Sequence, residues 1–436
     1  MRVLPFWADG GADAETDATL APGTHLLAAY PTEVVSKRIE DLGPGGLVPF
    51  LERHLPPPSD AALPLVVVLL AYDAGRAVSG HEVLSRRPTH GRPHPHDALP
   101  DVVIARYDGY LEAPSGAGDW TAHGDTAALS RALAGAPLAA SPATIGPLVD
   151  PRGTAAYLEG FAAIRDGIAA GDFYQVNLAR RLEATLEGPT SAIGIAALAW
   201  RLFEGLRHTQ PTAFGALMPV DEQTWLVSGS PECLLDWCAS SRTARSYPIK
   251  GTTSRASGEA DGALATALAA SAKDQAEHVM IVDLVRNDLG RVAVPGTVAV
   301  SRLFAELPLR TLRHLVSEVC CQVAPEHHLA DLVGALFPGG SITGAPKIAA
   351  MKALDRLEPF QRGLYCGSLG VMRGGRSARF SILIRSAVLS PHGLTYCAGG
   401  GIVADSSPEA ELAETDLKAL AMNAALARAG SGRASS

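Results

Sequence analysis

The chain has 436 residues, of which 47% are hydrophobic and 19% charged, so it is long enough to bury a large core. Its formal net charge of −8 and the lack of any Lys/Arg-rich run exclude an extended nucleic-acid-binding surface. The longest apolar run, residues 63–72, is too short to span a membrane and predicts a buried strand, and the six cysteines, with no CxxC pair, are typical of reduced thiols in the cytoplasm.

Residues 1–145, rich in Ala, Pro and Gly, form a predicted N-terminal region. No secretory signal peptide is expected at its start, because "MRVLPFWADGGADAETD" lacks an apolar stretch of useful length. A Pro-rich loop there contains His90, His94 and His96. We interpret these histidines as solvated rather than metal-binding, since no Cys or acidic ligand shares their spacing.

A linker at residues 141–154 leads into a predicted catalytic domain over residues 150–428. Apolar residues spaced three or four apart predict a helix that ends near Gly171. "FYQVNLARRLEATL" then alternates like a strand, with one face formed by Tyr174, Val176 and Leu178.

Residues 262–290 predict one long helix that stops at Gly290. Two strands are expected in "FSILIRSAVLS" and "GLTYCAGGGIVA", and a final helix begins at the N-cap Ser407. Residues 429–436 are expected to form a disordered tail. Because helices and strands do not alternate as βαβ units, the predicted fold class is α+β.

Two pairs of carboxylates stand three residues apart on predicted helices: Asp274 with Glu277, and Glu411 with Glu414. Each pair projects from one helix face, and oxygen ligands without Cys or well-spaced His favour a hard cation such as Mg²⁺. The alternative is that both faces are simply solvated. Lys418, four residues after Glu414, is then either a helix ion-pair partner or a cation within a site.

Glycine-rich stretches indicate a small anionic ligand. "FPGGSITGAPK" runs from a loop into a helix whose first turn holds Pro346, and free N–H groups at such a helix start attract anions. Neither this stretch nor "CAGGGIVADS" matches a nucleotide-binding fingerprint. Arg385, inside an apolar stretch, is either an edge residue or a buried clamp for a carboxylate.

Five segments, taken in order, resemble the chorismate-utilising enzyme family: "KDQAEHVMIVDLVRNDLGRV", "RHLVSEV", "FPGGSITGAPKIAAM", "RGLYCGSLG" and "CAGGGIVADSSPEAELAET". The likeness covers roughly residues 150–425 and is weak before them. It implies a large α+β fold of antiparallel β-sheets flanked by helices. It also implies Mg²⁺, which holds one carboxylate of the substrate chorismate.

The resemblance implies a role for each candidate residue. Glu277 and Glu414 match the family's Mg²⁺ ligands, with Asp274 and Glu411 as further acids acting directly or through water. Substrate contacts are implied for Thr252, Tyr365, Arg385, Gly399, Gly400, Gly401 and Lys418. His314 matches a histidine beside the reacting ring. Glu232, in "SGSPECLL", matches an acid that protonates the departing C4 hydroxyl.

Two positions help to separate the branches of this family. Where isochorismate and salicylate synthases carry a water-activating lysine, this chain has Gln175. Where anthranilate-forming members read "PIAGT", this chain reads "PIKGT", the form of the branch that makes 4-amino-4-deoxychorismate for 4-aminobenzoate. In that branch Lys250 would be the nucleophile, which requires a neutral amine near pH 7. Taken alone, Lys250 would be interpreted as a solvated surface charge.

The resemblance also implies partners. Ammonia would come from a separate glutamine amidotransferase subunit in a heterodimer, because the chain has no cysteine with G-x-C-x-G spacing. No nucleic-acid or membrane partner is expected. Some family members bind tryptophan beside a segment that corresponds here to residues 214–218. Three alternatives stay open: formation of anthranilate, formation of an aminodeoxyisochorismate, and a non-catalytic chorismate-binding regulatory protein.

Overall fold

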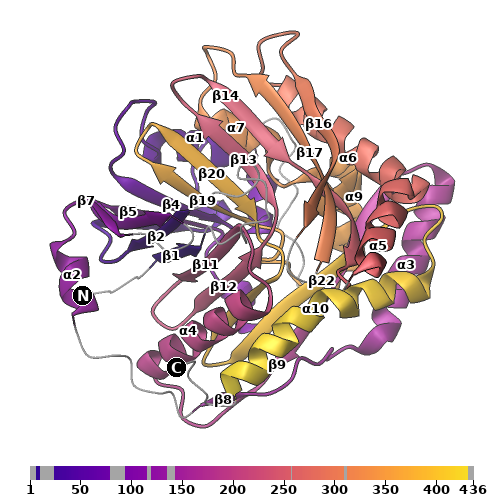
Figure 1. The fold of residues 1–436 in the computed structure, drawn as a ribbon, viewed down its shortest axis with the longest axis horizontal. Coiled ribbons are helices and arrows are strands. Elements are labelled where there is room, and N and C mark those ends of the chain that lie inside the picture. The colour runs from indigo at the N-terminus through magenta and orange to yellow at the C-terminus, as the bar shows by residue number, and fades with distance from the viewer. Residues whose placement is uncertain are drawn as a thin grey trace.

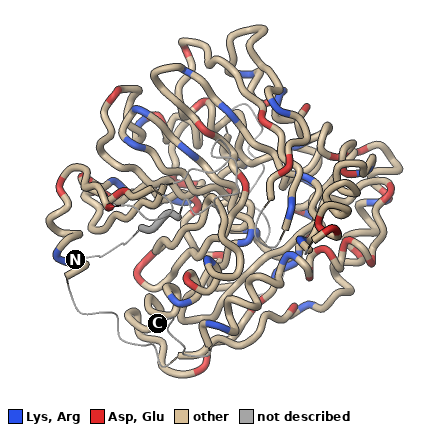
Figure 2. The backbone as a smooth tube through the Cα atoms, viewed as in Figure 1, with Lys and Arg blue, Asp and Glu red and all other residues tan. Residues whose placement is uncertain are grey.

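The computed structural model describes residues 6–9, 24–78, 94–114, 119–134, 143–256, 258–308 and 312–430. Two large antiparallel β-sheets lie face to face, and helices cover their outer surfaces (Figure 1). The fold is therefore α+β, as the absence of βαβ alternation predicts. Figure 2 shows acidic and basic residues interspersed along the described chain.

The first sheet joins strands from both ends of the chain. Its order is β18 (Gly344–Ala345), β9 (Gln175–Ala184), β22 (Gly393–Ile402), β21 (Ser386–Ser390), β12 (Trp225–Ser230), β11 (Phe214–Pro219), β1 (Phe6–Asp9), β2 (Thr24–Ala28), β6 (Gly109–Pro114) and β7 (Thr121–Gly124). A separate small ribbon pairs β8 (Thr144–Ile145) with β10 (Leu186–Glu187).

The second sheet is built in the same way. Its order is β15 (Ile249–Ser254), β17 (Leu312–Gln322), β14 (Thr243–Tyr247), β13 (Cys233–Cys238), β20 (Ser377–Ile382), β19 (Ser368–Arg373), β4 (Leu65–Leu70), β5 (Val102–Tyr107) and β3 (Glu33–Lys37), with β16 (Ala299–Pro308) beside β17. Strands of the N-terminal region thus extend both sheets. The division predicted near residue 145 stays a prediction.

Helices and short 3₁₀ turns connect and cover the strands. The helices are α1 (Leu47–His54), α2 (Ala127–Leu133), α3 (Gly153–Ala170), α4 (Ala192–Thr209), α5 (Glu259–Ala270), α6 (Ala272–Gly290), α7 (Leu329–Leu336), α8 (Gly340–Thr343), α9 (Lys347–Leu357) and α10 (Pro408–Gly430). The turns are η1 (Ile39–Asp41), η2 (Tyr72–Ala77) and η3 (Pro95–Ala98). No helix of the described residues is apolar over a length that could cross a membrane.

Separate apolar clusters hold these layers together. One lies between the sheets, a second packs α4 and α10 on the first sheet, and a third packs α1, α6 and α7 on the second. Strand β4 is buried along its whole length because its alternate side chains enter two clusters. The buried strand predicted from the apolar run 63–72 is therefore confirmed. All six cysteines are free thiols.

The expected helices and strands are largely present. Three differences follow here, and a fourth, at Arg385, is described with the active site. The helix predicted over residues 262–290 is two helices, because Ser271 leaves the helical conformation and its Oγ accepts the N–H of Asp274, at 3.3 Å, as the N-cap of α6. Pro346 is the N-cap of α9 and lies outside its first turn. Tyr174 precedes β9 and is 68% exposed, so it is not part of that strand's buried face.

The histidine loop also differs from expectation. His96 is buried, and its ring nitrogens lie 2.8 Å from Thr395 Oγ1 and 2.8 Å from Ser390 Oγ. Burial, reinforced by the charge of His94, lowers the pKa of His96 to about 3, so it is a neutral residue of the core. The prediction of a solvated side chain is wrong for His96. His90 lies outside the described residues.

Candidate active site

One cavity of about 240 Å³ collects residues from distant parts of the chain. It is bounded by β15 and β17 of the second sheet, β22 of the first, and the helices α6 and α10. Its walls include Glu232, Lys250, Thr252, Asp274, Glu277, His314, Tyr365, Arg385, Gly399, Gly401, Glu411, Glu414 and Lys418. Of the predicted site residues, Gly400 alone does not line it. A Cβ atom at Gly400 would lie 2.6 Å from Glu411 Oε2, directly behind the cavity wall.

Lys250 faces this cavity from β15. The register between β15 and β17 shifts just after Lys250, where Gly251 has a φ of +76° that favours glycine. Burial lowers the pKa of the Lys250 amine, although the negative charge of Glu277 opposes the change. The amine is therefore not the solvated surface charge that its local sequence suggests.

Gln175 lies beside Lys250 at the backbone of β22. A Cβ atom at Gly401 would be 2.2 Å from Gln175 Nε2 and 3.1 Å from Lys250 Nζ, so a larger residue there would displace the ends of both side chains. Gln175 is fully buried, and neither polar atom of its side chain has a hydrogen-bond partner among the described residues. A buried amide without partners is costly, and this one lies behind Gly401, which lines the cavity.

Glu232 lies where the chain passes from β12 of the first sheet to β13 of the second. Its side chain is 4% exposed, and Ser341 Oγ donates a hydrogen bond to its Oε1 at 2.7 Å. Burial raises the pKa of this carboxyl, while the Ser341 bond and the charge of Lys250 counteract the rise. A carboxyl held in this way is suited to donate a proton.

His314 lies on β17 opposite Thr252 of β15. Its Nδ1 is 2.9 Å from Thr252 Oγ1, and its buried Nε2 has no hydrogen-bond partner. Burial, reinforced by the charge of Arg385, lowers the pKa of His314 to about 3. The imidazole is therefore neutral at pH 7, and one ring nitrogen is available to a ligand.

Arg385 lies in the turn between β20 and β21. The stretch "FSILIRSAVLS" was expected to form one strand, but its two halves belong to different sheets, and Arg385 stands where the chain crosses with a φ of +52°. Among the described residues its guanidinium has no ion-pair or hydrogen-bond partner, and burial lowers its pKa, with Tyr396 and Glu232 opposing. Arg385 is therefore neither an edge-strand residue nor a core arginine with an ion-pair partner. It suits a clamp for an anion.

The two acid pairs meet across the cavity from α6 and α10. Burial raises the pKa of both Glu277 and Glu411. The charge of Glu411 raises the pKa of Glu277 further, and the charge of Glu414 does the same to Glu411. Lys273 Nζ stands between them, 3.9 Å from Glu277 Oε1 and 3.8 Å from Glu411 Oε1. Lys418 Nζ is 2.6 Å from Glu414 Oε1, and its charge and hydrogen bond lower the pKa of Glu414 against the effect of burial.

These carboxylates do not converge on one point. In the described part of the chain, no group of three or more His, Cys, Asp or Glu side chains is arranged to hold a metal ion. Glu411 Oε2 is nevertheless buried without a partner, while Oε1 accepts a hydrogen bond from Ser406 Oγ at 2.6 Å. The donor set, all carboxylate oxygen and partly unsatisfied, fits a hard divalent cation.

The cavity also holds residues that sequence reasoning did not select, namely Asn177, Lys273, Ser341, Ile342, Tyr396 and Leu417. Asn177 lies in the "QVNLAR" strand, two residues after Gln175. Ser341 and Ile342 lie in the glycine-rich stretch 337–347, which was expected to bind a ligand through its backbone. The side-chain hydroxyl of Ser341 was the overlooked group.

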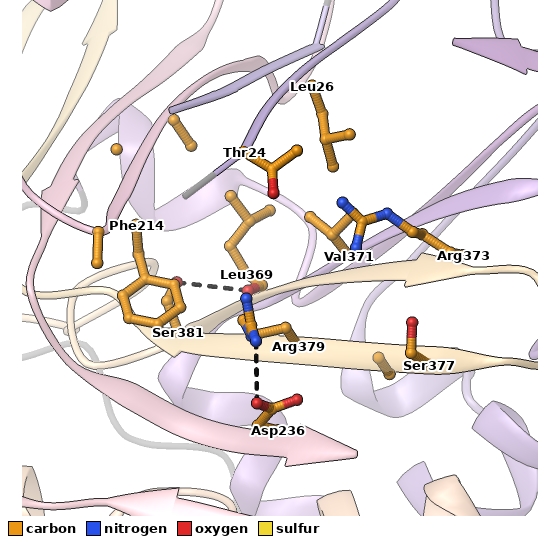
Figure 3. A pocket seen from close by; sticks show the side chains of 14 residues that line it. Thr24, Leu26, Phe214, Asp236, Leu369, Val371, Arg373, Ser377, Arg379 and Ser381 are labelled. Atoms are coloured by element: carbon orange, nitrogen blue, oxygen red, sulfur yellow. Dashed lines mark hydrogen bonds and ion pairs between the residues drawn. The ribbon is translucent and has the colours of Figure 1, made fainter. Parts of the chain in front are cut away.

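A second cavity of about 130 Å³ opens between the sheets (Figure 3). Phe214, Thr24 and Leu26 lie on its first-sheet side, and Arg379 of the second sheet is bound to Asp236 at 3.0 Å. Phe214 begins the segment 214–218, for which the family resemblance implies tryptophan binding in some members. The cavity is separate from the one that contains Lys250.

The fold and the Lys250 cavity are those of an enzyme class, and a comparison with family models identifies this class. The model of a family described as chorismate binding enzyme matches residues 13–424, so the chain belongs to this family.

Individual relatives fall into two named groups. The aminodeoxychorismate synthase component 1 of Salmonella typhimurium is 43% identical over 59% of this chain and 55% of its own length. The anthranilate synthase component 1 of Streptomyces coelicolor is 40% identical over 63% of this chain and 52% of its own length. The chain thus spans about half the length of these curated relatives in the matched regions.

Solved structures agree on the fold across nearly the whole chain. Anthranilate synthase component I from Streptococcus pneumoniae superposes with a TM-score of 0.75 at 25% identity, covering 95% of this chain and 93% of that one. An isochorismate synthase from Bacillus anthracis gives a TM-score of 0.69 at 21% identity, which concerns the fold alone.

Proposed function

We propose that this chain is the chorismate-aminating component of an aminodeoxychorismate synthase, converting chorismate and ammonia to 4-amino-4-deoxychorismate. The observation that carries the proposal is the Lys250 amine, which is half-buried beside Gln175 and lies in the same cavity as Glu232. Relatives named aminodeoxychorismate synthase component 1, at 43–44% identity, support it.

Arg385 and Tyr365 would bind a carboxylate of chorismate. A guanidinium fork matches carboxylate geometry, and Arg385 has no such partner among the described residues. Burial raises the pKa of Tyr365 well above its ordinary range, so its hydroxyl stays protonated and can donate a hydrogen bond. Gly399 and Gly401 leave the backbone of β22 open to the ligand.

The reaction would proceed through a covalent exchange at the ring. The neutral amine of Lys250 attacks C2, both ring double bonds shift, from C1=C2 to C1=C6 and from C5=C6 to C4=C5, and the C4 hydroxyl leaves as water after Glu232 donates its proton. The amine of the adduct loses a proton. Ammonia then adds at C4, both double bonds shift back, and the Lys250 amine departs from C2 as it takes up a proton, while the new C4 ammonium gives one up. The side-chain carbonyl of Gln175 would accept a hydrogen bond from the incoming ammonia, since it has no partner in the described part of the chain.

Mg²⁺ is the cation that these acids would hold. Glu277 and Glu414 would be its ligands, with Asp274 and Glu411 acting directly or through water. When bound, the ion supplies positive charge that holds a substrate carboxylate and offsets the repulsion between the acids. Lys273 and Lys418 perform that neutralising role within the chain itself.

A glutamine amidotransferase subunit would supply the ammonia. The name "component 1" of the relatives indicates a further component in those enzymes. We place the reaction in the cytoplasm, where six free cysteines would remain reduced.

Anthranilate formation is the second candidate. A relative named anthranilate synthase component 1, at 40% identity, favours it. The two reactions give different products from one substrate, so a single incubation separates them. Purified protein would be mixed with chorismate, Mg²⁺ and ammonium, and the product identified by mass and by conversion to 4-aminobenzoate with an added lyase. We expect 4-amino-4-deoxychorismate, and anthranilate in its place would refute the proposal.

A further inference from the structure

A buried ion pair lies directly behind the wall of the Lys250 cavity. Arg362 and Glu358 have side chains that are 0% and 1% exposed. Arg362 Nε donates to Glu358 Oε2 at 2.8 Å and Nη2 to Oε1 at 2.7 Å, which is the two-pronged geometry that only arginine can provide. Neither residue lines the cavity itself.

The pair binds the backbone of two segments that do line the cavity. Arg362 Nη1 donates to the carbonyl of Ile342 at 2.8 Å, and Nη2 donates to the carbonyl of Asn177 at 2.5 Å. Glu358 Oε1 accepts the N–H of Ala179 at 3.0 Å. The ion pair thus satisfies backbone groups of β9 that a further strand would otherwise pair, and it ties β9 to the end of α8.

The guanidinium also fixes an aromatic ring of the cavity. Arg362 Cζ lies 4.8 Å from the ring centre of Tyr72 and 5.6 Å from that of Tyr365. These are distances at which a cation attracts an aromatic face, and the attraction is strong where water is excluded. Tyr365 is one of the residues proposed to bind the substrate carboxylate.

A hydrogen-bond chain continues from this pair to Glu232. Asn177 Nδ2 donates to the carbonyl of Ser341 at 3.1 Å, and Ser341 Oγ donates to Glu232 Oε1 at 2.7 Å. Arg362 therefore holds the backbone of Asn177 and of Ile342, the residue next to Ser341. Displacement of either segment would move the Ser341 hydroxyl, whose hydrogen bond influences the protonation of Glu232.

We infer that the Arg362–Glu358 pair is a positioning element for the reaction, which orients Tyr365 for substrate binding and holds the Ser341 hydroxyl on Glu232. The inference rests on the proposed role of Glu232 as the proton donor. Lysine cannot replace Arg362, because a single ammonium cannot reach Glu358 and both carbonyls in one plane. Arg362 acts through Ser341 and Asn177 and does not touch the substrate.

The consequence is a change in pH dependence. The Ser341 bond favours the ionised carboxylate of Glu232, so its loss raises the pKa of Glu232 further. Because the protonated acid is the active form, the fall in kcat at high pH then begins at a higher pH. We expect a shift of about one pH unit, as loss of one hydrogen bond to a charged group implies.

The test compares the high-pH fall in kcat of the unaltered protein with that of four variants by following chorismate consumption with ammonium and Mg²⁺. Arg362→Lys and Ser341→Ala should both move this fall to higher pH, and the double variant should move it no further than either single change. Arg242→Lys is the matched control. Arg242 likewise donates to backbone carbonyls, of Val323 and His327, and lies over an aromatic ring, yet none of these groups lines the cavity.

Arg242→Lys should lower the stability of the protein and leave the pH dependence of kcat unchanged. This control separates an effect of positioning at the active site from a general loss of stability. If Arg362→Lys does not fold, Glu358→Gln provides the same comparison with the arginine retained. A high-pH fall that coincides with that of the unaltered protein, or shifts that add in the double variant, would overturn the inference. If anthranilate were the product, the proposed function would fail, while the chorismate-consumption profiles would still decide the role of Arg362.

Discussion

Replacement of Arg385 by methionine should stabilise the protein while abolishing its binding of chorismate. Arg385 is half-buried in the cavity wall, partial desolvation lowers the pKa of its guanidinium, and among the described residues it has no ion-pair partner. A partly desolvated charge without a partner destabilises the folded state, and a methionine of similar length would fill the space without that penalty. The φ of +52° at this position is unchanged by the substitution, so backbone strain does not enter the comparison.

The expected gain is about 1 kcal/mol in the free energy of unfolding, the low end of the range of about 1–4 kcal/mol found when fully buried ion pairs are replaced by apolar side chains, because Arg385 is only partly buried. Urea unfolding at pH 7.5 without ligand would measure it. Titration calorimetry with chorismate should show a loss of about 2–5 kcal/mol in binding, equivalent to roughly 30-fold to several-thousand-fold in Kd. If Arg385→Met is less stable than the unaltered protein, Arg385 has a partner within the chain and its assignment as a substrate clamp is wrong.

Three further outcomes are expected. Below pH 6.5 His96 is protonated in the unfolded chain but not in the folded protein, because burial lowers its pKa in the folded protein to about 3. This difference in protonation lowers the free energy of unfolding by about 2 kcal/mol at pH 5. Urea unfolding of His96→Gln should therefore show a correspondingly weaker pH dependence. Gly401→Ala, whose Cβ would lie 2.2 Å from Gln175 Nε2, should lower kcat at least about tenfold with an unchanged far-UV circular dichroism spectrum, whereas full activity would contradict the close packing beside Lys250. Phe214→Ala should leave kcat unchanged, because the cavity that Phe214 lines is separate from the one that contains Lys250; a clear fall in kcat would contradict that separation.

Local patterns were sufficient for much of the fold. The apolar run 63–72 predicted β4, the apolar spacing before Gly171 predicted α3, and Ser407 marked the start of α10. Ser271 was overlooked because it stands between two helical stretches, where an N-cap serine and an interior serine look alike in sequence. The crossing at Arg385 could not be found, because both halves of "FSILIRSAVLS" have strand character and only tertiary packing assigns them to different sheets.

Site residues could be predicted from the sequence only where they lie in a recognisable spacing or motif. The acids on α6 and α10 follow from helix spacing, and family resemblance selected Lys250 and Glu232. The groups that were missed act through contacts between distant segments. Ser341 meets Glu232 across 109 positions of sequence, and Arg362 meets Asn177 across 185. The periodic spacing of apolar and polar residues does not predict contacts between residues so far apart in the sequence.

The most direct test of the account is the mass of the Lys250 peptide after incubation with chorismate and Mg²⁺ in the absence of ammonia. Attack by the Lys250 amine with loss of the C4 hydroxyl predicts an increase equal to chorismate less one water, confined to the peptide that contains Lys250. Added ammonium should remove this adduct as 4-amino-4-deoxychorismate forms, and Lys250→Ala should form no adduct and lose amination by at least about 100-fold. No adduct on Lys250, together with an undiminished rate in Lys250→Ala, would contradict the assignment of this lysine as the nucleophile.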